Sequence, residues 1–116
     1  MAELIKALKS VAEESRLRIL RLLVDEELSV AELQEILGMG QSRISMALGH
    51  LKQAGLVEVR KAGQKSLHRF SGDETVRGLV RQAAGELPEA AADQEALALV
   101  LDKRRDRMRA YFDEMA

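Results

Sequence analysis

The chain has 116 residues, of which 47% are hydrophobic and 32% are charged, with a formal net charge of −1. This length and balance indicate one soluble globular domain, and a core of aliphatic side chains, because aromatic residues make up only 3%. The lack of cysteine excludes disulfides, thiolate redox sensing and cysteine-built metal sites, and the lack of a long apolar run or a signal peptide leads us to expect a cytoplasmic protein with no membrane partner.

The first 28 residues predict two helices. A short amphipathic helix is expected over residues 3–9. Ser10 and Glu13 have the spacing of a capping box, which predicts the start of the next helix. That helix, over residues 16–24, is apolar on more than one face and is expected to be the central core helix. The acidic turn at residues 25–27 is expected to lie in solvent, away from any phosphate.

A helix-turn-helix follows. Ser29 and Glu32 form a second capping box, which starts a helix that Gly38 interrupts. A second helix is predicted over residues 41–54, with a stop at Gly55. Its inward positions are Ile44, Leu48 and Leu51.

Two alternating segments then predict a β-hairpin. Residues 56–60 and 66–70 read as strands, and residues 61–65 as the hairpin tip. A helix-turn-helix that leads directly into a basic hairpin is a winged helix, an arrangement that reads duplex DNA. The predicted fold class is therefore mainly α with a small β-hairpin.

The distribution of charge supports this interpretation. Residues 38–70 hold six basic residues and one acidic residue, a balance of +5, whereas residues 1–37 and residues 71–116 each carry −3. Such clustering is the electrostatic footprint of nucleic-acid binding.

The residue types in this stretch suit different parts of a duplex. Arg43 is expected to bond guanine O6 and N7, and Gln41 to pair with adenine in the same way. Met46 is placed to touch a thymine methyl group. The cations of the hairpin are expected to contact phosphates and the minor groove, and so to set affinity more than sequence choice. The predicted DNA-binding residues are Gln41, Ser42, Arg43, Ser45, Met46, His50, Arg60, Lys61, Lys65 and Arg69.

The two histidines leave alternatives open. His50 is either a phosphate contact or a solvated helix residue. His68 alternates with Leu67 and is either a contact of the hairpin or a packed strand residue.

After the hairpin, a helix is predicted over residues 74–85, with Val76, Leu79, Val80 and Ala83 on one side. Pro88 interrupts the chain before an alanine-rich connector over residues 89–92. We expect a winged-helix domain over residues 1–86, then a connector and a last helix over residues 87–116. The apolar stripe of that helix packs either on its own domain or against a second subunit.

The motifs of this chain resemble those of the ArsR/SmtB family of small dimeric repressors. The resemblance covers residues 4–70, and it is carried by LKSVA at 8–12, SRLRILRLL at 15–23, LSVAEL at 28–33, QSRIS at 41–45 and LKQAGLV at 51–57. It implies a homodimeric repressor, with a recognition helix from each subunit on an inverted-repeat operator. It also implies a dimer interface on the first and last helices, which we assign to Leu4, Ile5, Leu8, Leu97, Val100, Leu101, Met108, Tyr111 and Phe112.

The chain departs from the family in ways that bear on its effector. Many members sense metals through Cys-Val-Cys, but the matching positions here are Ser29-Val30-Ala31, and no histidine lies beyond residue 70. No metal site is therefore predicted, and we expect a repressor that is released or modulated by a non-metal effector. Where the family often has Arg-His or His-His midway along the recognition helix, this chain has Met46-Ala47, so an operator sequence cannot be transferred from relatives.

A second resemblance covers residues 102–116. This stretch is similar to the joint between an ArsR-like domain and a S-adenosylmethionine-dependent methyltransferase domain. It implies S-adenosylmethionine or S-adenosylhomocysteine as the effector, and an alternative function as the regulatory module of a larger methyltransferase protein. A third hypothesis is a protein-interaction domain that has lost DNA binding. Because the sequence holds no catalytic constellation or phosphate loop, we predict neither an enzyme nor a cofactor.

Overall fold

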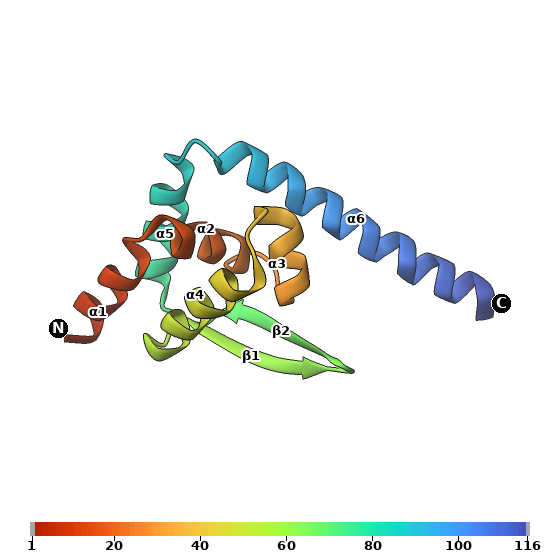
Figure 1. Ribbon diagram of the computed structural model, residues 1–116, viewed down its shortest axis with the longest axis horizontal. Helices are drawn as coiled ribbons and strands as arrows, with labels where there is room; N and C mark the ends of the chain where they lie inside the picture. The colour runs from red at the N-terminus through yellow and green to blue at the C-terminus, as the bar shows by residue number, and fades with distance from the viewer. Residues whose placement is uncertain (1, 116) are drawn as a thin grey trace.

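The computed structural model describes residues 2–115, and its fold is mainly helical with a small β-hairpin, as predicted (Figure 1). The elements in chain order are α1 (Ala2–Val11), α2 (Glu14–Leu23), α3 (Val30–Leu37), α4 (Gln41–Gln53), β1 (Val57–Ala62), β2 (Lys65–Phe70), α5 (Glu74–Gly85) and α6 (Ala90–Met115). None of the helices in this part of the chain is long and apolar enough to cross a bilayer.

Helix α2 forms the centre of the core, which confirms its prediction. Ile19, Leu20 and Leu22 are fully buried, and Leu17 and Leu23 are nearly so. Burial of each such side chain stabilises the fold by about 1.5–3 kcal/mol. The other five helices and strand β2 contact α2, so α2 fixes the position of the helix-turn-helix relative to both ends of the chain.

The predicted capping box at Ser10 is wrong. Ser10 continues helix α1, and its carbonyl oxygen accepts a hydrogen bond from Arg16 Nε at 2.5 Å. Glu13 is the N-cap of α2 instead, and its carboxylate accepts the backbone N–H groups of Ser15 and Arg16, both at 3.0 Å. A carboxylate next to the free N–H groups satisfies them directly, and Ser10 is therefore not needed as a cap.

The second capping box is confirmed. Ser29 Oγ accepts the N–H of Glu32 at 3.2 Å, and the Glu32 carboxylate accepts the N–H of Ser29 at 3.0 Å. Gly38 ends α3 in the left-handed conformation, with φ of 67°. Gly55 follows α4 with φ of 75°, at the predicted stop.

The hairpin is longer and its tip shorter than predicted. The register runs from Val57 opposite Phe70 to Ala62 opposite Lys65, so the loop holds only Gly63 and Gln64 instead of five residues. Gly63 has φ of 65°, which suits the first central position of a tight type II′ turn and lets the ladder extend to the tip.

A short bridge joins the hairpin to the rest of the domain. Leu28 and His68 exchange two backbone hydrogen bonds, of 3.0 and 2.8 Å. His68 is 4% exposed, so it is the packed strand residue of the two alternatives. The base of the hairpin is therefore held to the segment that precedes α3.

Helix α5 has its predicted bounds, and Asp73 caps it through the Val76 N–H at 3.0 Å. Its buried face is partly different from the prediction. Val76 and Val80 are buried, but Leu79 is exposed and Ala84 replaces Ala83 in the core. The apolar side of α5 is therefore split between the core and the surface.

Helix α6 begins at Ala90, so the predicted connector at residues 89–92 is wrong. Alanine is the strongest helix former, and the chain needs only residues 86–89 to turn after α5. Asp93 in the first turn is buried and accepts two hydrogen bonds of 2.9 Å from Arg18, which fix this end of α6 to α2.

The two halves of α6 have different surroundings. Leu97 and Val100 are 5% and 3% exposed, and Leu101 is half-buried against the core. These three residues, assigned above to a dimer interface, pack on the chain's own domain because α6 crosses α2 and α3. The distal half projects beyond the body of the domain (Figure 1), with Met108, Tyr111, Phe112 and Met115 exposed. The boundary between residues 86 and 87 stays a prediction.

Candidate nucleic-acid interface

Helix α4 divides into a buried side and a solvent side. Ile44, Leu48 and Leu51 are buried, as predicted, and Ala47 joins them. The solvent side carries the side chains predicted for DNA contact: Gln41, Ser42, Arg43, Ser45, Met46 and His50. Met46 is 68% exposed, although an apolar side chain of this size is usually buried in a single domain. The adjacent Met46-Ala47 pair thus faces outward and inward respectively.

The first turn of α4 has unused backbone donors. Gly40 is the N-cap and provides no side-chain hydrogen bond. The free N–H groups of a helix N-terminus, together with the helix dipole, favour a phosphate. The start of α4 is therefore suited to hold a duplex backbone while the side chains beyond it face the groove.

Arg43 is held by a contact that the sequence did not predict. Its Nη2 atom donates a hydrogen bond of 2.5 Å to Ser15 Oγ, at the start of α2. Arg43, Met46 and His50 line one small hollow beside α2, because residues three, four and seven apart share a helix face. The bond to Ser15 holds the Arg43 guanidinium against the start of α2.

The four predicted cations of the hairpin fall into two pairs. Arg60 donates two hydrogen bonds to Glu27, of 2.7 and 2.9 Å, and Arg69 donates one of 2.7 Å to Glu58. Lys61 and Lys65 form no ion pair within residues 2–115. Surface ion pairs contribute at most about 1 kcal/mol, so a phosphate can displace the carboxylates. Of these four cations, Lys61 and Lys65 can therefore bind a phosphate without first breaking an ion pair.

The position of Glu27 corrects one expectation. The acidic turn was expected to lie away from phosphates, but the hydrogen bonds from Arg60 hold the Glu27 carboxylate against β1 and lower its pKa. The separation along the chain, 33 residues, hides this contact from sequence analysis. The acidic turn therefore neutralises part of the basic hairpin.

His68 does not contribute to the positive surface. Burial lowers its pKa, and the positive charge of Lys52 lowers it further, while an interaction of the imidazole with the backbone of Leu28 acts in the opposite sense. The imidazole is therefore neutral near pH 7, and its backbone serves to anchor the hairpin.

Helix α6 is tied to the first helix of the helix-turn-helix. Arg104 bonds the Glu32 carboxylate, and Lys103 bonds Glu35 at 2.5 Å. The alternation of bases and acids over residues 102–109 predicts ion pairs along the helix itself, without a phosphate role for these cations. This holds for Arg105, which pairs with Asp102, but not for Lys103 and Arg104.

Within residues 2–115, no group of three or more histidine, cysteine or acidic side chains is placed to hold a metal ion. The exposed side of α4 and the unpaired lysines of the hairpin supply hydrogen-bond donors and cations. Such groups bind phosphates and read base edges.

Comparisons with known proteins agree with this geometry. The sequence model of the family described as bacterial regulatory protein, arsR family, matches residues 13–59. The transcriptional activator HlyU of Vibrio cholerae is 42% identical over 73 residues, which cover 63% of this chain and 68% of HlyU. The biofilm growth-associated repressor of Xylella fastidiosa is 35% identical over 69 residues, or 60% of each chain, so the match spans less than two thirds of that repressor.

Solved structures give the same result. HlyU from Vibrio cholerae superposes with a TM-score of 0.65 at 38% identity, over 71% of this chain and 88% of that one. A 1–100 fragment of Mb0332 from Mycobacterium bovis, described as a homodimeric winged helix-turn-helix DNA-binding domain, gives 0.63 at 33% identity, over 76% and 83%. The winged helix-turn-helix fold is therefore confirmed.

Proposed function

Because this chain belongs to the ArsR family of bacterial regulatory proteins, we propose that it is a homodimeric transcriptional repressor that binds an inverted-repeat operator and responds to a non-metal effector. One observation carries the proposal. The exposed polar side of α4 and the free lysines of the hairpin belong to one helix-turn-helix-hairpin unit, in which base-reading groups sit beside phosphate-binding ones. The side chains of α4 enter a major groove, and Lys61 and Lys65 contact the flanking backbone.

The surface of α1 and α5 supports the proposed dimer. Leu4, Ile5 and Leu8 are 41–48% exposed, and Leu79 of α5 is 42% exposed. Leu8 and Leu79 border an apolar hollow of about 530 Å³ between α1, α2 and α5. A two-fold copy that covers this face removes these side chains from water, and places two recognition helices about one turn of DNA, ~34 Å, apart.

The test of function is selection of bound sequences from a random duplex library by the purified protein near physiological salt. We expect enrichment of an inverted repeat. Enrichment of a single, asymmetric half-site would contradict the dimeric mode, and no enrichment together with no salt-sensitive affinity for duplex DNA would favour the protein-interaction hypothesis.

The test of assembly is sedimentation of an Ile5→Glu, Leu8→Glu variant. A buried charge at a subunit contact is costly, so we expect a monomer with weaker operator binding. Leu99→Glu is the matched control, because Leu99 is an exposed leucine of α6 that does not line the hollow between α1, α2 and α5. A dimer that survives the double substitution would move the interface to the other predicted contacts, Met108, Tyr111 and Phe112.

The sign of regulation and the identity of the effector stay predictions. Among the relatives, HlyU is named an activator and the Xylella protein a repressor, so the sign of regulation is tested with a reporter gene behind the selected operator. The identity of the effector as S-adenosylmethionine or S-adenosylhomocysteine, and the methyltransferase alternative, are untested. No catalytic residue or cofactor is proposed.

A further inference from the structure

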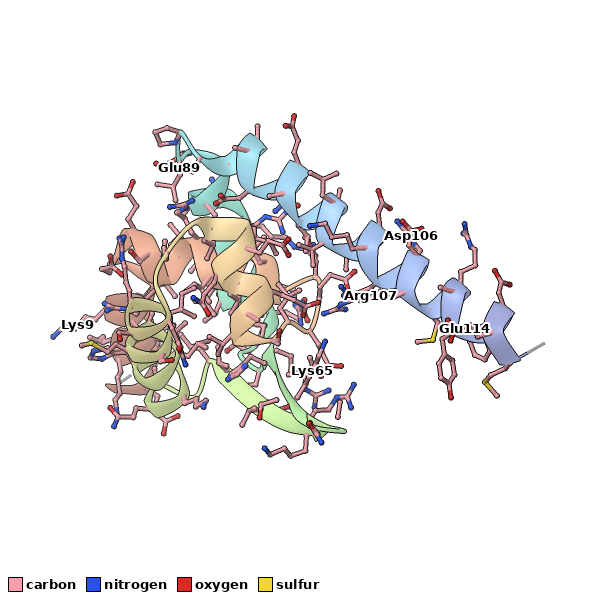
Figure 2. The ribbon with its side chains drawn as sticks, turned by 45° about the vertical axis from the view of Figure 1, so that its right-hand side comes forward. Lys9, Lys65, Glu89, Asp106, Arg107 and Glu114 are labelled. Carbon is pink, nitrogen blue, oxygen red and sulfur yellow. The ribbon has the colours of Figure 1, made fainter. Side chains whose placement is uncertain are left out.

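We infer that the groove between the distal half of α6 and the hairpin binds a small aromatic carboxylate, and that this ligand is the effector of the regulator proposed above. Two adjoining hollows, of about 370 and 550 Å³, form the groove, and both are lined by Glu32, Lys65 and Arg107. These volumes are in the range of small-molecule sites. Figure 2 shows Arg107 on the side of α6 that faces the hairpin, with Lys65 on the hairpin below it.

The charge of the groove selects an anion. Arg104 and Lys103 at its inner wall are neutralised by Glu32 and Glu35. Lys65 and Arg107 form no ion pair with any residue that the structure describes, so two uncompensated cations from different elements border the same space. A carboxylate placed between them gains charge-assisted hydrogen bonds and relieves their mutual repulsion.

The apolar side chains of the groove favour a ligand with an aromatic ring. The larger hollow is also lined by the apolar side chains of Leu67 and Met108 and by the ring of Tyr111. Met108 and Tyr111 are each 57% exposed, next to the cations. Thioether and ring side chains contact aromatic ligands favourably. An inorganic anion makes no use of this wall, whereas a ring that bears a carboxylate uses both the wall and the cations.

A second copy of the chain fits the groove less well. A two-fold contact on this face brings Lys65 and Arg107 of each copy to one seam, where like charges oppose association. The apolar surface of α1 and α5 carries no such uncompensated pair among its lining residues. Met108 and Tyr111, which the sequence assigned to a dimer, are thus walls of a ligand site.

The position of the groove couples it to DNA binding. Lys65 is one of the two hairpin cations free for phosphates, and Leu67 lies next to the strand residue that anchors the hairpin. A carboxylate on Lys65 withdraws that charge from DNA, so ligand and operator oppose each other. By linkage, the factor by which the ligand weakens operator binding equals the factor by which the operator weakens ligand binding.

Calorimetric titration of the full chain tests the site without DNA. The probes are phenylacetate, indole-3-acetate and naphthalene-2-carboxylate, each compared with its neutral carboxamide. We expect saturable binding of at least one carboxylate, at least tenfold tighter than its amide. Arg107→Ala and Tyr111→Ala should each weaken binding about tenfold, whereas Arg109→Ala, an exposed cation of the same helix outside the groove, should change it less than twofold.

Three results would overturn the inference. The first is no saturable binding by any carboxylate, or equal binding of the amides. The second is a loss of operator affinity in ligand-free Arg107→Ala as large as in Lys61→Ala, which would assign these cations to DNA phosphates. The third is dissociation of the dimer by Tyr111→Ala. Operator binding and ligand binding are measured separately. If no carboxylate binds, the proposed DNA-binding function is unaffected. If the protein binds no operator, the proposed function is wrong, but a measured ligand affinity still stands.

Discussion

Arg104 of α6 holds the same carboxylate that caps helix α3. Its Nε and Nη2 atoms donate to the two oxygens of Glu32 at 2.7 and 2.6 Å, while Glu32 also accepts the backbone N–H of Ser29. A third bond from Arg104, of 2.7 Å to the carbonyl oxygen of Glu27, extends the network to the acidic turn. The last helix is thereby joined to the first turn of the helix-turn-helix.

Loss of this link should destabilise the domain. Arg104→Ala leaves the largely buried Glu32 carboxylate with one partner fewer, and the free energy of unfolding should fall by about 1–3 kcal/mol. Arg105→Ala is the matched control, because its exposed pair with Asp102 lies within one helix and contributes under about 0.5 kcal/mol. Urea denaturation measures both values. Equal losses in the two variants would mean that α6 is not held through Glu32.

The same carboxylate should make stability depend on pH. Burial raises the pKa of Glu32, but the bonds from Arg104 and Ser29 outweigh burial, and the pKa lies below its ordinary value. The stabilisation is therefore fully present above the unfolded pKa, about 4.3, and is lost as the pH falls through the lower folded pKa. Unfolding free energies measured from pH 6 to 3 should drop less steeply in Arg104→Ala. An unchanged slope would assign the acid sensitivity to other carboxylates.

His68 should add a separate step at higher pH. Because its folded pKa is lowered by burial and by the charge of Lys52, the unfolded chain takes up a proton first. Stability is fully present above the unfolded pKa, about 6.5, and falls as the pH drops from there toward the folded pKa. Urea denaturation at pH 7.5 and 5.5 should show this loss in the native chain but not in His68→Leu. A loss of the same size in both chains would contradict the assignment.

Local patterns predicted most of the fold. The capping box at Ser29, the stop at Gly55 and the buried positions of α4 depend on neighbours within a few residues, and such signals are readable in one sequence. Ser10 and Glu13 show the limit of this reasoning, because two residues with the right spacing do not reveal which of them caps the helix.

The features that the sequence did not predict depend on contacts between residues that are far apart in the chain. The bonds of Glu27 with Arg60 and of Ser15 with Arg43 join residues 33 and 28 positions apart, and they change which cations of the candidate interface are free. The apolar stripe of α6 predicted a partner surface but left open whether it lies on the same chain or on a second subunit, and the first half of the helix packs on α2 and α3 of the same chain. Periodicity identifies an apolar face without identifying what covers it.

The free and paired cations of the hairpin should differ in their effect on DNA affinity. Lys61→Ala should reduce the slope of log affinity against log salt by about 0.9, since one phosphate contact is lost. Glu27→Gln should act in the opposite direction, because Arg60 is released for a phosphate. Fluorescence anisotropy with a labelled duplex between 50 and 300 mM salt measures both. Lys9→Ala, a cation of α1 far from the hairpin in Figure 2, is the control and should leave the slope unchanged. An unaltered slope in Lys61→Ala would remove the hairpin from the contact surface.

Arg43 should determine sequence choice rather than general affinity. A bidentate bond to guanine discriminates by about 1–3 kcal/mol, so Arg43→Ala should relax the selected motif at one position of each half-site. Ser15→Ala removes the acceptor that holds Arg43 back, and the arginine then reaches the groove without breaking a hydrogen bond, so this variant should keep the motif and bind it at least as tightly. Selection from the random duplex library, repeated with both variants, distinguishes the two roles. If Arg43→Ala selects the unchanged motif, Arg43 does not read a base, and its bond with Ser15 serves only to fix α4 against α2.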